Sequence, residues 1–220
     1  MIKFNTIKYQ WPAQYPGLLL LSLIIGFTGT MALITESIIT PMQLLFGIIA
    51  GTIALLYNQK IIGIHLRSIK GVKAFSIASV SIIAAVFIPA AKFPIAEVNL
   101  SLIALYALAQ FLFISALCIA SDLRDIDEDK EDQIKTFPVA AGAAISKKII
   151  SILMGIHILL LFIIYNLNFM NLHQLEGYLM VSMLTLLFIA NLNPSKGYYY
   201  FILGVDGLIL CQSISILICN

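Results

Sequence analysis

The sequence predicts an all-α membrane protein, a seven-transmembrane-helix bundle that forms a single integral-membrane domain over residues 1–220. Apolar residues make up 60% of the chain and charged residues only 11%, against about 25% in an average soluble domain. The apolar residues fall in long uninterrupted runs, whereas the strands of a membrane β-barrel would alternate. Such a chain is not an ordinary soluble enzyme, and its net charge of +2 is too small for a nucleic-acid binder.

Seven apolar runs are candidates for membrane spans, each of which needs about 20 residues. They are 17–34, 41–57, 74–91, 98–120, 149–167, 177–192 and 198–219. The second and sixth runs are short, so their ends are the least defined. The first run follows two lysines, as a signal peptide would, but it exceeds a typical h-region of about 7–15 residues and no A-x-A site follows it. We therefore expect it to be a retained helix.

The orientation follows from the Lys and Arg residues in the loops. Twelve of the thirteen fall on the N-terminal side of the predicted membrane, and only Lys92 falls on the other. Because Lys and Arg concentrate in cytoplasmic loops, we expect an inner or cytoplasmic membrane protein with its N-terminus cytoplasmic and its C-terminus outside. Two large loops, 58–73 and 121–148, then face the cytoplasm.

Acidic residues concentrate in the second of these loops, where seven of the eleven lie between Asp122 and Asp132. If the preceding helix continues through this run, Asp122, Asp125, Asp129 and Asp132 share a face less than a quarter-turn wide. Such crowding is unfavourable unless cations neutralise it, and carboxylate oxygens are hard ligands that favour Mg²⁺ or Ca²⁺.

Two plainer interpretations of the run stay open at this point. It is a solvated charge block, or it is a helix-end cluster neutralised by Arg124, Lys130 and Lys135. An EF-hand is excluded, because the sixth position of such a loop is Lys130 rather than Gly and the twelfth is Thr136 rather than Glu.

The stretch 121–142 resembles the second aspartate-rich motif of the UbiA superfamily of intramembrane prenyltransferases. That pattern reads approximately N-D-x-x-D-x-x-x-D-(K/R)-x-x-G-x-x-T-(L/F)-P-V, with a Gly shortly after. The matching residues are Asp122, Asp125, Asp129, Lys130, Thr136, Pro138, Val139 and Gly142. Ser121 replaces the usual Asn, and Gln133 replaces the usual Gly. Leu56-Tyr57 and the basic segment 67–73 also resemble the family pattern, and Asp206-Gly207 does so more weakly.

The resemblance implies that the seven predicted helices correspond to the last seven of the family fold. It also implies transfer of a prenyl group from a prenyl diphosphate to an aromatic or lipid acceptor with Mg²⁺. Asp122, Asp125 and Asp129 are then the metal ligands and catalytic residues. The implied partners are the prenyl diphosphate, membrane lipid and a hydrophobic acceptor.

Five further residues are candidates for binding the substrate. They are Tyr57, Lys60, Arg67, Lys130 and Asp206. Lys60 is one residue short of the family spacing from Tyr57, and both also suit a membrane interface. Asp206 lies inside the last apolar run, where a carboxylate usually faces a cavity or a partner. His157, Gln110 and Gln212 are expected instead to form hydrogen bonds between helices.

The main departure from the family is the first aspartate-rich motif, because no Asp precedes Asp122 in this sequence. Three explanations remain open, namely a mis-assigned start, a short divergent member, or a member that no longer catalyses. The alternative function is therefore a non-catalytic isoprenoid-lipid-binding or assembly protein that keeps the fold and one cation site.

Overall fold

The computed structural model describes residues 39–58, 69, 71–131, 133–193 and 200–218. By its internal contacts the chain divides into Met1–Pro41 and Met42–Asn220, and the description below concerns the second unit. Every regular element in the described residues is a helix, with no strand among them. The predicted helix 17–34 lies outside the described residues.

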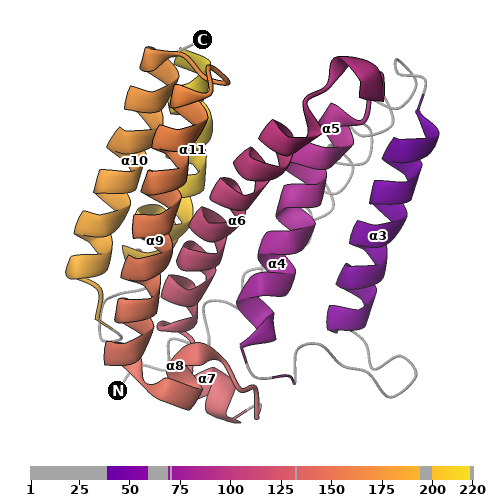
Figure 1. Ribbon diagram of the computed structural model, residues 1–220. Helices are drawn as coiled ribbons and strands as arrows, with labels where there is room; N and C mark the ends of the chain where they lie inside the picture. The colour runs from indigo at the N-terminus through magenta and orange to yellow at the C-terminus, as the bar shows by residue number, and fades with distance from the viewer. Residues whose placement is uncertain (1–38, 59–68, 70, 132, 194–199, 219–220) are drawn as a thin grey trace, which may run out of the picture. The chain divides into compact units, whose positions relative to one another are not determined.

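The helices follow the predicted apolar runs in order (Figure 1). The long elements are α3 (Pro41–Asn58), α4 (Val72–Ile82) continued by η2 (Ile83–Phe87) and α5 (Ile88–Ala90), α6 (Leu100–Asp122), α9 (Ala143–Asn166), α10 (Leu172–Ala190), and η4 (Tyr200–Asp206) continued by α11 (Gly207–Ile218). The short elements are η3 (Ile95–Glu97), α7 (Ile126–Glu131) and α8 (Phe137–Ala141).

Four of these helical segments are long and apolar enough to cross a membrane. They are Val72–Ala90, Leu100–Asp122, Ala143–Asn166 and Leu172–Ala190. Pro41–Tyr57 is a shorter apolar helix. The described residues therefore support an integral membrane protein with four candidate spans, and the count of seven stays a prediction.

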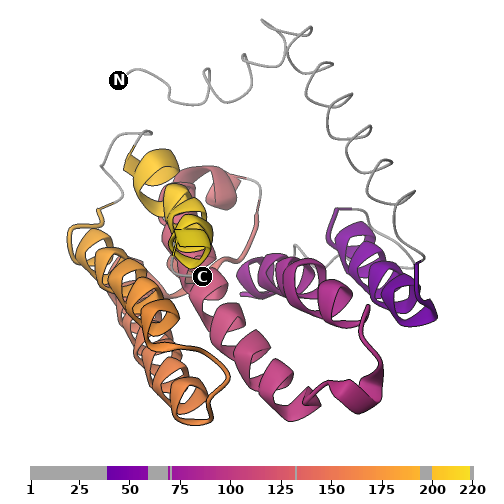
Figure 2. The same ribbon diagram turned by 90° about the horizontal axis from the view of Figure 1, so that it is seen from above.

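Helix α6 is the central element of the unit. In the view from above, α6 lies between α4 on one side and α9 on the other, with α10 beyond α9 (Figure 2). The core around α6 combines buried side chains from six elements, α4, α6, α9, α10, η4 and α11, and includes Phe113, Met154, Val181 and Phe201. Large apolar side chains that point away from this core are exposed, as a lipid-facing surface requires.

Two helices begin five or six residues earlier than hydropathy predicted. Helix α9 begins at Ala143 instead of residue 149, because its first turns carry Lys147 and Lys148, whose long side chains can reach the membrane edge from within a helix. Helix α10 begins at Leu172 instead of residue 177. There the side chain of Asn171 accepts from the amide of Gln174, and the Gln174 side chain accepts in return from the amide of Asn171.

Polar side chains connect the spans from within. The His157 ring is fully buried, with Nδ1 2.8 Å from the carbonyl oxygen of Ala109 on α6 and Nε2 3.2 Å from Oγ of Ser182 on α10. The prediction that His157 bonds between helices is therefore confirmed. Near the opposite end of α6 from Asp122, the hydroxyls of Tyr106 and Tyr178 lie 2.6 Å apart.

The second half of the Val72–Ala90 span contacts α3. Element η2 is a π-helical turn, and at its end the Phe87 ring stacks on Phe46 with ring centroids 5.4 Å apart. Nε2 of Gln43 donates to the carbonyl oxygen of Ile88 at 3.2 Å. The first half of the same span packs instead against α6, through buried Ala74 and Ala78 among others.

Candidate functional site

The aspartate-rich run does not continue α6 as one helix. Helix α6 ends at Asp122, and the amides of Leu123 and Arg124 donate to the carbonyl oxygens of Ala120 and Ser121 in a tightened last turn. The chain then bends before the separate helix α7. The prediction of one shared carboxylate face was therefore wrong, because the bend lets the carboxylates reach cations in two directions instead of crowding on one face.

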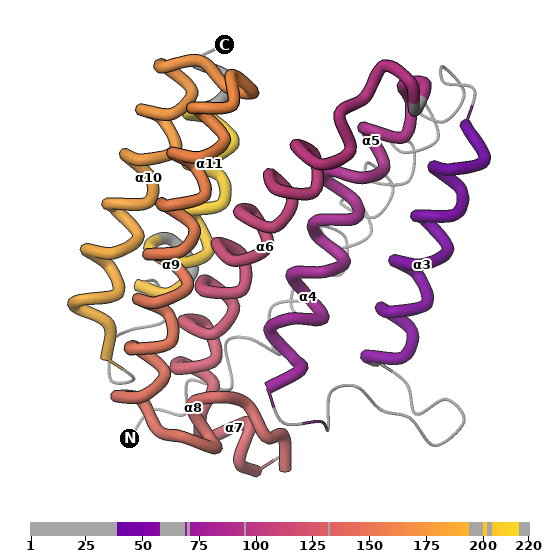
Figure 3. The backbone as a smooth tube through the Cα atoms, viewed as in Figure 1, coloured from indigo at the N-terminus to yellow at the C-terminus, as the bar shows by residue number. Residues whose placement is uncertain are grey.

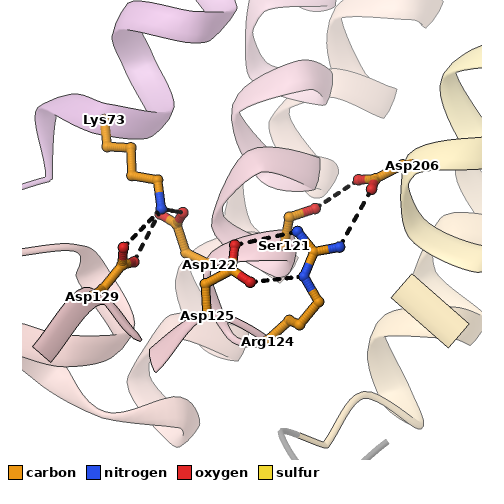
Figure 4. A network of polar contacts seen from close by, with 7 residues as sticks. All are labelled: Lys73, Ser121, Asp122, Arg124, Asp125, Asp129 and Asp206. Atoms are coloured by element: carbon orange, nitrogen blue, oxygen red, sulfur yellow. Dashed lines mark hydrogen bonds and ion pairs between the residues drawn. The ribbon is translucent and has the colours of Figure 1, made fainter. Parts of the chain in front are cut away.

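Lys73, in the first turn of α4, lies between two of the predicted aspartates (Figure 4). Its Nζ is 2.9 Å from Oδ1 of Asp122, and it donates to Oδ1 and Oδ2 of Asp129 at 3.1 and 3.0 Å. The side chains are 14%, 5% and 4% exposed in the order Lys73, Asp122, Asp129. These three residues form a buried network of ion pairs, which we name the Lys73 cluster.

The third predicted aspartate is held elsewhere, by Arg124. Nε and Nη2 of Arg124 donate to Oδ1 and Oδ2 of Asp125 at 2.8 and 3.2 Å, which is the fork geometry that guanidinium favours. Nη1 of Arg124 lies 3.7 Å from Oδ2 of Asp206, and Oγ of Ser121 donates to Oδ1 of Asp206 at 2.8 Å. We name these four residues the Arg124 cluster, and Figure 4 shows it joining the end of α6 to η4.

Gly71 fixes the position of Lys73. Gly71 has φ +73°, which a residue with a side chain rarely adopts, and a Cβ there would lie 2.9 Å from the ring of Phe137. Its amide donates to the carbonyl oxygen of Lys135 at 2.8 Å. The chain entering α4 is thus fastened against the segment between α7 and α8, which brings Lys73 to the aspartates.

The two carboxylates of the Lys73 cluster are oxygen ligands of the kind that Mg²⁺ takes. Mg²⁺ usually takes one or two carboxylates and completes its shell with water and phosphate oxygens. Oδ2 of Asp122 is buried and has no hydrogen-bond partner among the described residues, so this oxygen has capacity for a further ligand. The three-carboxylate set is not assembled, and the described residues contain no cluster of three or more His, Cys, Asp or Glu arranged to hold a metal.

The other predicted site residues lie apart from the Lys73 cluster or outside the described residues. Tyr57 is half-buried in the last turn of α3. Lys130 is exposed, with Nζ 4.0 Å from Oδ1 of the exposed Asp127. Lys60 and Arg67 fall outside the described residues. Asp206 lies in the Arg124 cluster, where its side chain is 45% exposed.

An apolar cavity of about 370 Å³ lies between α3, the α4–η2 segment and α6. Its lining includes Ile53, Ser79, Ile82, Phe87, Ala104 and Phe111. Ser79 is about 9 Å along the helix from Lys73, at 1.5 Å per residue.

A comparison with known protein families gave a match that covers these residues. A model of the UbiA prenyltransferase family matches residues 15–210, which include both clusters and the cavity. Searches of curated protein sequences and of solved structures gave no match. Since the family match extends over most of the 220 residues, the resemblance of the aspartate-rich motif reflects membership. The chain belongs to the UbiA prenyltransferase family.

Proposed function

We propose that this chain binds a prenyl diphosphate at the Lys73 cluster and, with Mg²⁺, transfers the prenyl group to a hydrophobic aromatic or lipid acceptor. The proposal rests mainly on one observation. Asp122 and Asp129 come from two different helices, yet both contact the same ammonium at the end of the bundle. Two carboxylates with nearby cations are what a magnesium-bound diphosphate requires.

Asp122 and Asp129 would hold the ion, since oxygens of both carboxylates already contact the same ammonium, that of Lys73. When bound, the ion would withdraw charge from the diphosphate and ease its departure from the prenyl carbon. Asp125 would join this set only after leaving Arg124. In this proposal Asp125 therefore acts in the Arg124 cluster, where it orients the turn after α6.

The residues of this chain supply the remaining functions. The ammonium of Lys73 has three donors, and phosphate oxygens are suitable acceptors once Asp122 and Asp129 have turned to a metal. Lys60, Arg67 and Lys130 are proposed as further phosphate contacts. Tyr57 would offer a ring face to an allylic cation, and the apolar cavity would take the prenyl chain away from water.

A second candidate function is a non-catalytic isoprenoid-lipid-binding or assembly protein. It is favoured by the ion pairs within the two clusters. Asp122 and Asp129 both pair with Lys73, and Asp125 pairs with Arg124, so each of the three predicted ligands already has a protein cation as a partner. A chain of this kind would bind a prenyl diphosphate by its charge and its apolar tail without ionising it.

The two candidates are separated by assaying the purified full chain with prenyl diphosphates of several lengths and a panel of aromatic and lipid acceptors. The test variant is Asp122→Asn with Asp129→Asn. The control is Asp127→Asn, which removes one charge from α7 at a side chain that is 97% exposed. We expect Mg²⁺-dependent transfer that the double variant lowers by about a thousandfold or more, because a metal contributes several kcal/mol and 1.36 kcal/mol is tenfold.

Transfer that the double variant leaves unchanged would contradict the site. Prenyl diphosphate binding without transfer, lost in the double variant and kept in Asp127→Asn, would establish the second candidate instead.

A further inference from the structure

A second hollow lies on the outer surface of the bundle, between α9 and α10. The groove has a volume of about 510 Å³ and is lined by Lys147, Lys148, Ser151, Ile152, Leu186, Ile189 and Ala190. Figure 3 shows α9 and α10 running side by side, with the start of α9 near the end of α10. The groove thus combines two ammonium groups at one end with an apolar floor.

The two lysines at this groove have no acidic partner among the described residues. No ion pair of the described part of the chain includes Lys147 or Lys148, whereas the aspartates beside α6 pair with Lys73 and Arg124. The Ser151 hydroxyl donates to the carbonyl oxygen of Lys147 at 3.0 Å, so its lone pairs and both ammonium groups remain available. This end of the groove has a net positive charge that an anion would complement.

Beyond the lysines the groove opens onto an apolar surface. Ile152 is 61% exposed, and Ile156 and Leu159 follow it at helical spacing on α9 with exposures of 42% and 58%. On α10, Met183 is 58% exposed and lies three residues before Leu186, on the same helix face. These exposed apolar side chains form one stripe on α9 and one on α10. Both stripes run from the lysine end toward the middle of the spans, as acyl chains beside the helices would.

We propose that this groove binds an anionic glycerophospholipid, with its phosphate on Lys147 and Lys148 and an acyl chain over Ile152 and Leu186. A basic pocket between transmembrane helices at the membrane surface is a recognised form of anionic headgroup site. The site is distinct from the Lys73 cluster, because none of its lining residues belongs to that cluster. It therefore stands whether or not the chain transfers prenyl groups.

The test measures lipid binding to the detergent-purified full chain by native mass spectrometry, with phosphatidylglycerol and phosphatidylcholine of identical acyl chains. We expect phosphatidylglycerol to be preferred by about 30-fold, from two lysines close to one anionic headgroup. Lys147→Gln with Lys148→Gln should remove the preference and leave phosphatidylcholine binding unchanged. Glycerol phosphate, which has no acyl chains, should not displace the lipid.

The matched control is Lys92→Gln with Lys135→Gln, which removes the same charge at two exposed lysines outside the groove. This control should keep the preference. Equal binding of the two lipids by the unaltered chain would overturn the proposal even if the lysine variants failed to fold. Loss of the preference in the control, or displacement by glycerol phosphate alone, would also overturn it, as would a groove closed by a second copy in a lipid-free dimer.

Discussion

Lys73 donates to both carboxylate oxygens of Asp129, at 3.1 and 3.0 Å, from a helix that begins more than fifty residues earlier in the chain. The same ammonium contacts Asp122. Lys73 therefore links the aspartate-rich loop to α4, and the stability of the loop depends in part on that cation.

Replacing Lys73 with Met should lower the free energy of unfolding by about 3 kcal/mol or more, because it leaves two buried carboxylates without a cation. Added Mg²⁺ should restore more stability to this variant than it adds to the unaltered protein, since the ion no longer competes with Lys73. Thermal unfolding in detergent, with and without Mg²⁺, measures both effects. Lys135→Met, at an exposed lysine beside the same loop, is the control and should change neither. A Lys73→Met variant as stable as the control would contradict the role of Lys73.

Replacing Arg124 with Gln should loosen η4 from the end of α6. The variant loses the fork to Asp125, the contact with Asp206 and the stacking of the guanidinium on Phe201, whose ring centroid is 5.8 Å from Cζ. We expect a cost of about 1–2 kcal/mol, limited because Asp206 is partly exposed. Hydrogen exchange of residues 200–206 should speed up by about tenfold, since 1.4 kcal/mol is a factor of ten. Arg124→Lys keeps the charge but loses the fork and should give a smaller change, so exchange in Arg124→Lys as slow as in the unaltered protein would refute a role for the fork.

Replacing Gly71 with Ala should cost about 1–3 kcal/mol, because the new Cβ adds backbone strain at φ +73° and meets the Phe137 ring. Gly155→Ala is the matched control, since a Cβ at Gly155 in α9 meets nothing within 4 Å. That change should be neutral or stabilise by up to about 1 kcal/mol, as Ala does in a helix. Denaturation of the two variants under the same conditions measures the difference. Equal stability would show that the Gly71 backbone can rearrange freely.

The distribution of Lys and Arg predicts which side each loop occupies. Reporter fusions at residues 65 and 128 should show that these positions lie in the cytoplasm. Fusions at 95, 170 and 220 should show that those positions lie outside. A fusion at 128 that reports an outside position would reverse the orientation and separate the aspartates from a cytoplasmic diphosphate.

Hydropathy predicted the helices of the described residues well, because burial in lipid imposes long apolar runs whatever the partners are. Their ends were less predictable. Because of Lys147 and Lys148, the apolar run begins only at residue 149, whereas the helix already begins at Ala143. A lysine at the membrane edge costs little when its side chain reaches water, so the helix includes both lysines.

The sequence also identified Asp122 and Asp129 but not their partner. Lys73 stood at the end of the basic segment 67–73, but no local spacing connects it to an aspartate in a distant helix. The positive φ of Gly71 and the hydrogen bond from its amide to the Lys135 carbonyl oxygen bring the two segments together, and neither is visible in the pattern of residue types. The separation of Asp125 was equally hidden, because no Pro or Gly marks the bend after Asp122.

The π-helical turn η2 changes the helical register within the Val72–Ala90 span, between the half that packs on α6 and the half that contacts α3. A π turn inserts a residue relative to an α-helix, and one residue is about 100° of rotation. Deleting Ala84 would restore a continuous α-helix and swing Phe87 and the Ile88 carbonyl away from α3, while Lys73 and Ala78 kept their contacts with the aspartates and α6. The inserted residue thus lets one span pack against α6 at its charged end and against α3 at its far end.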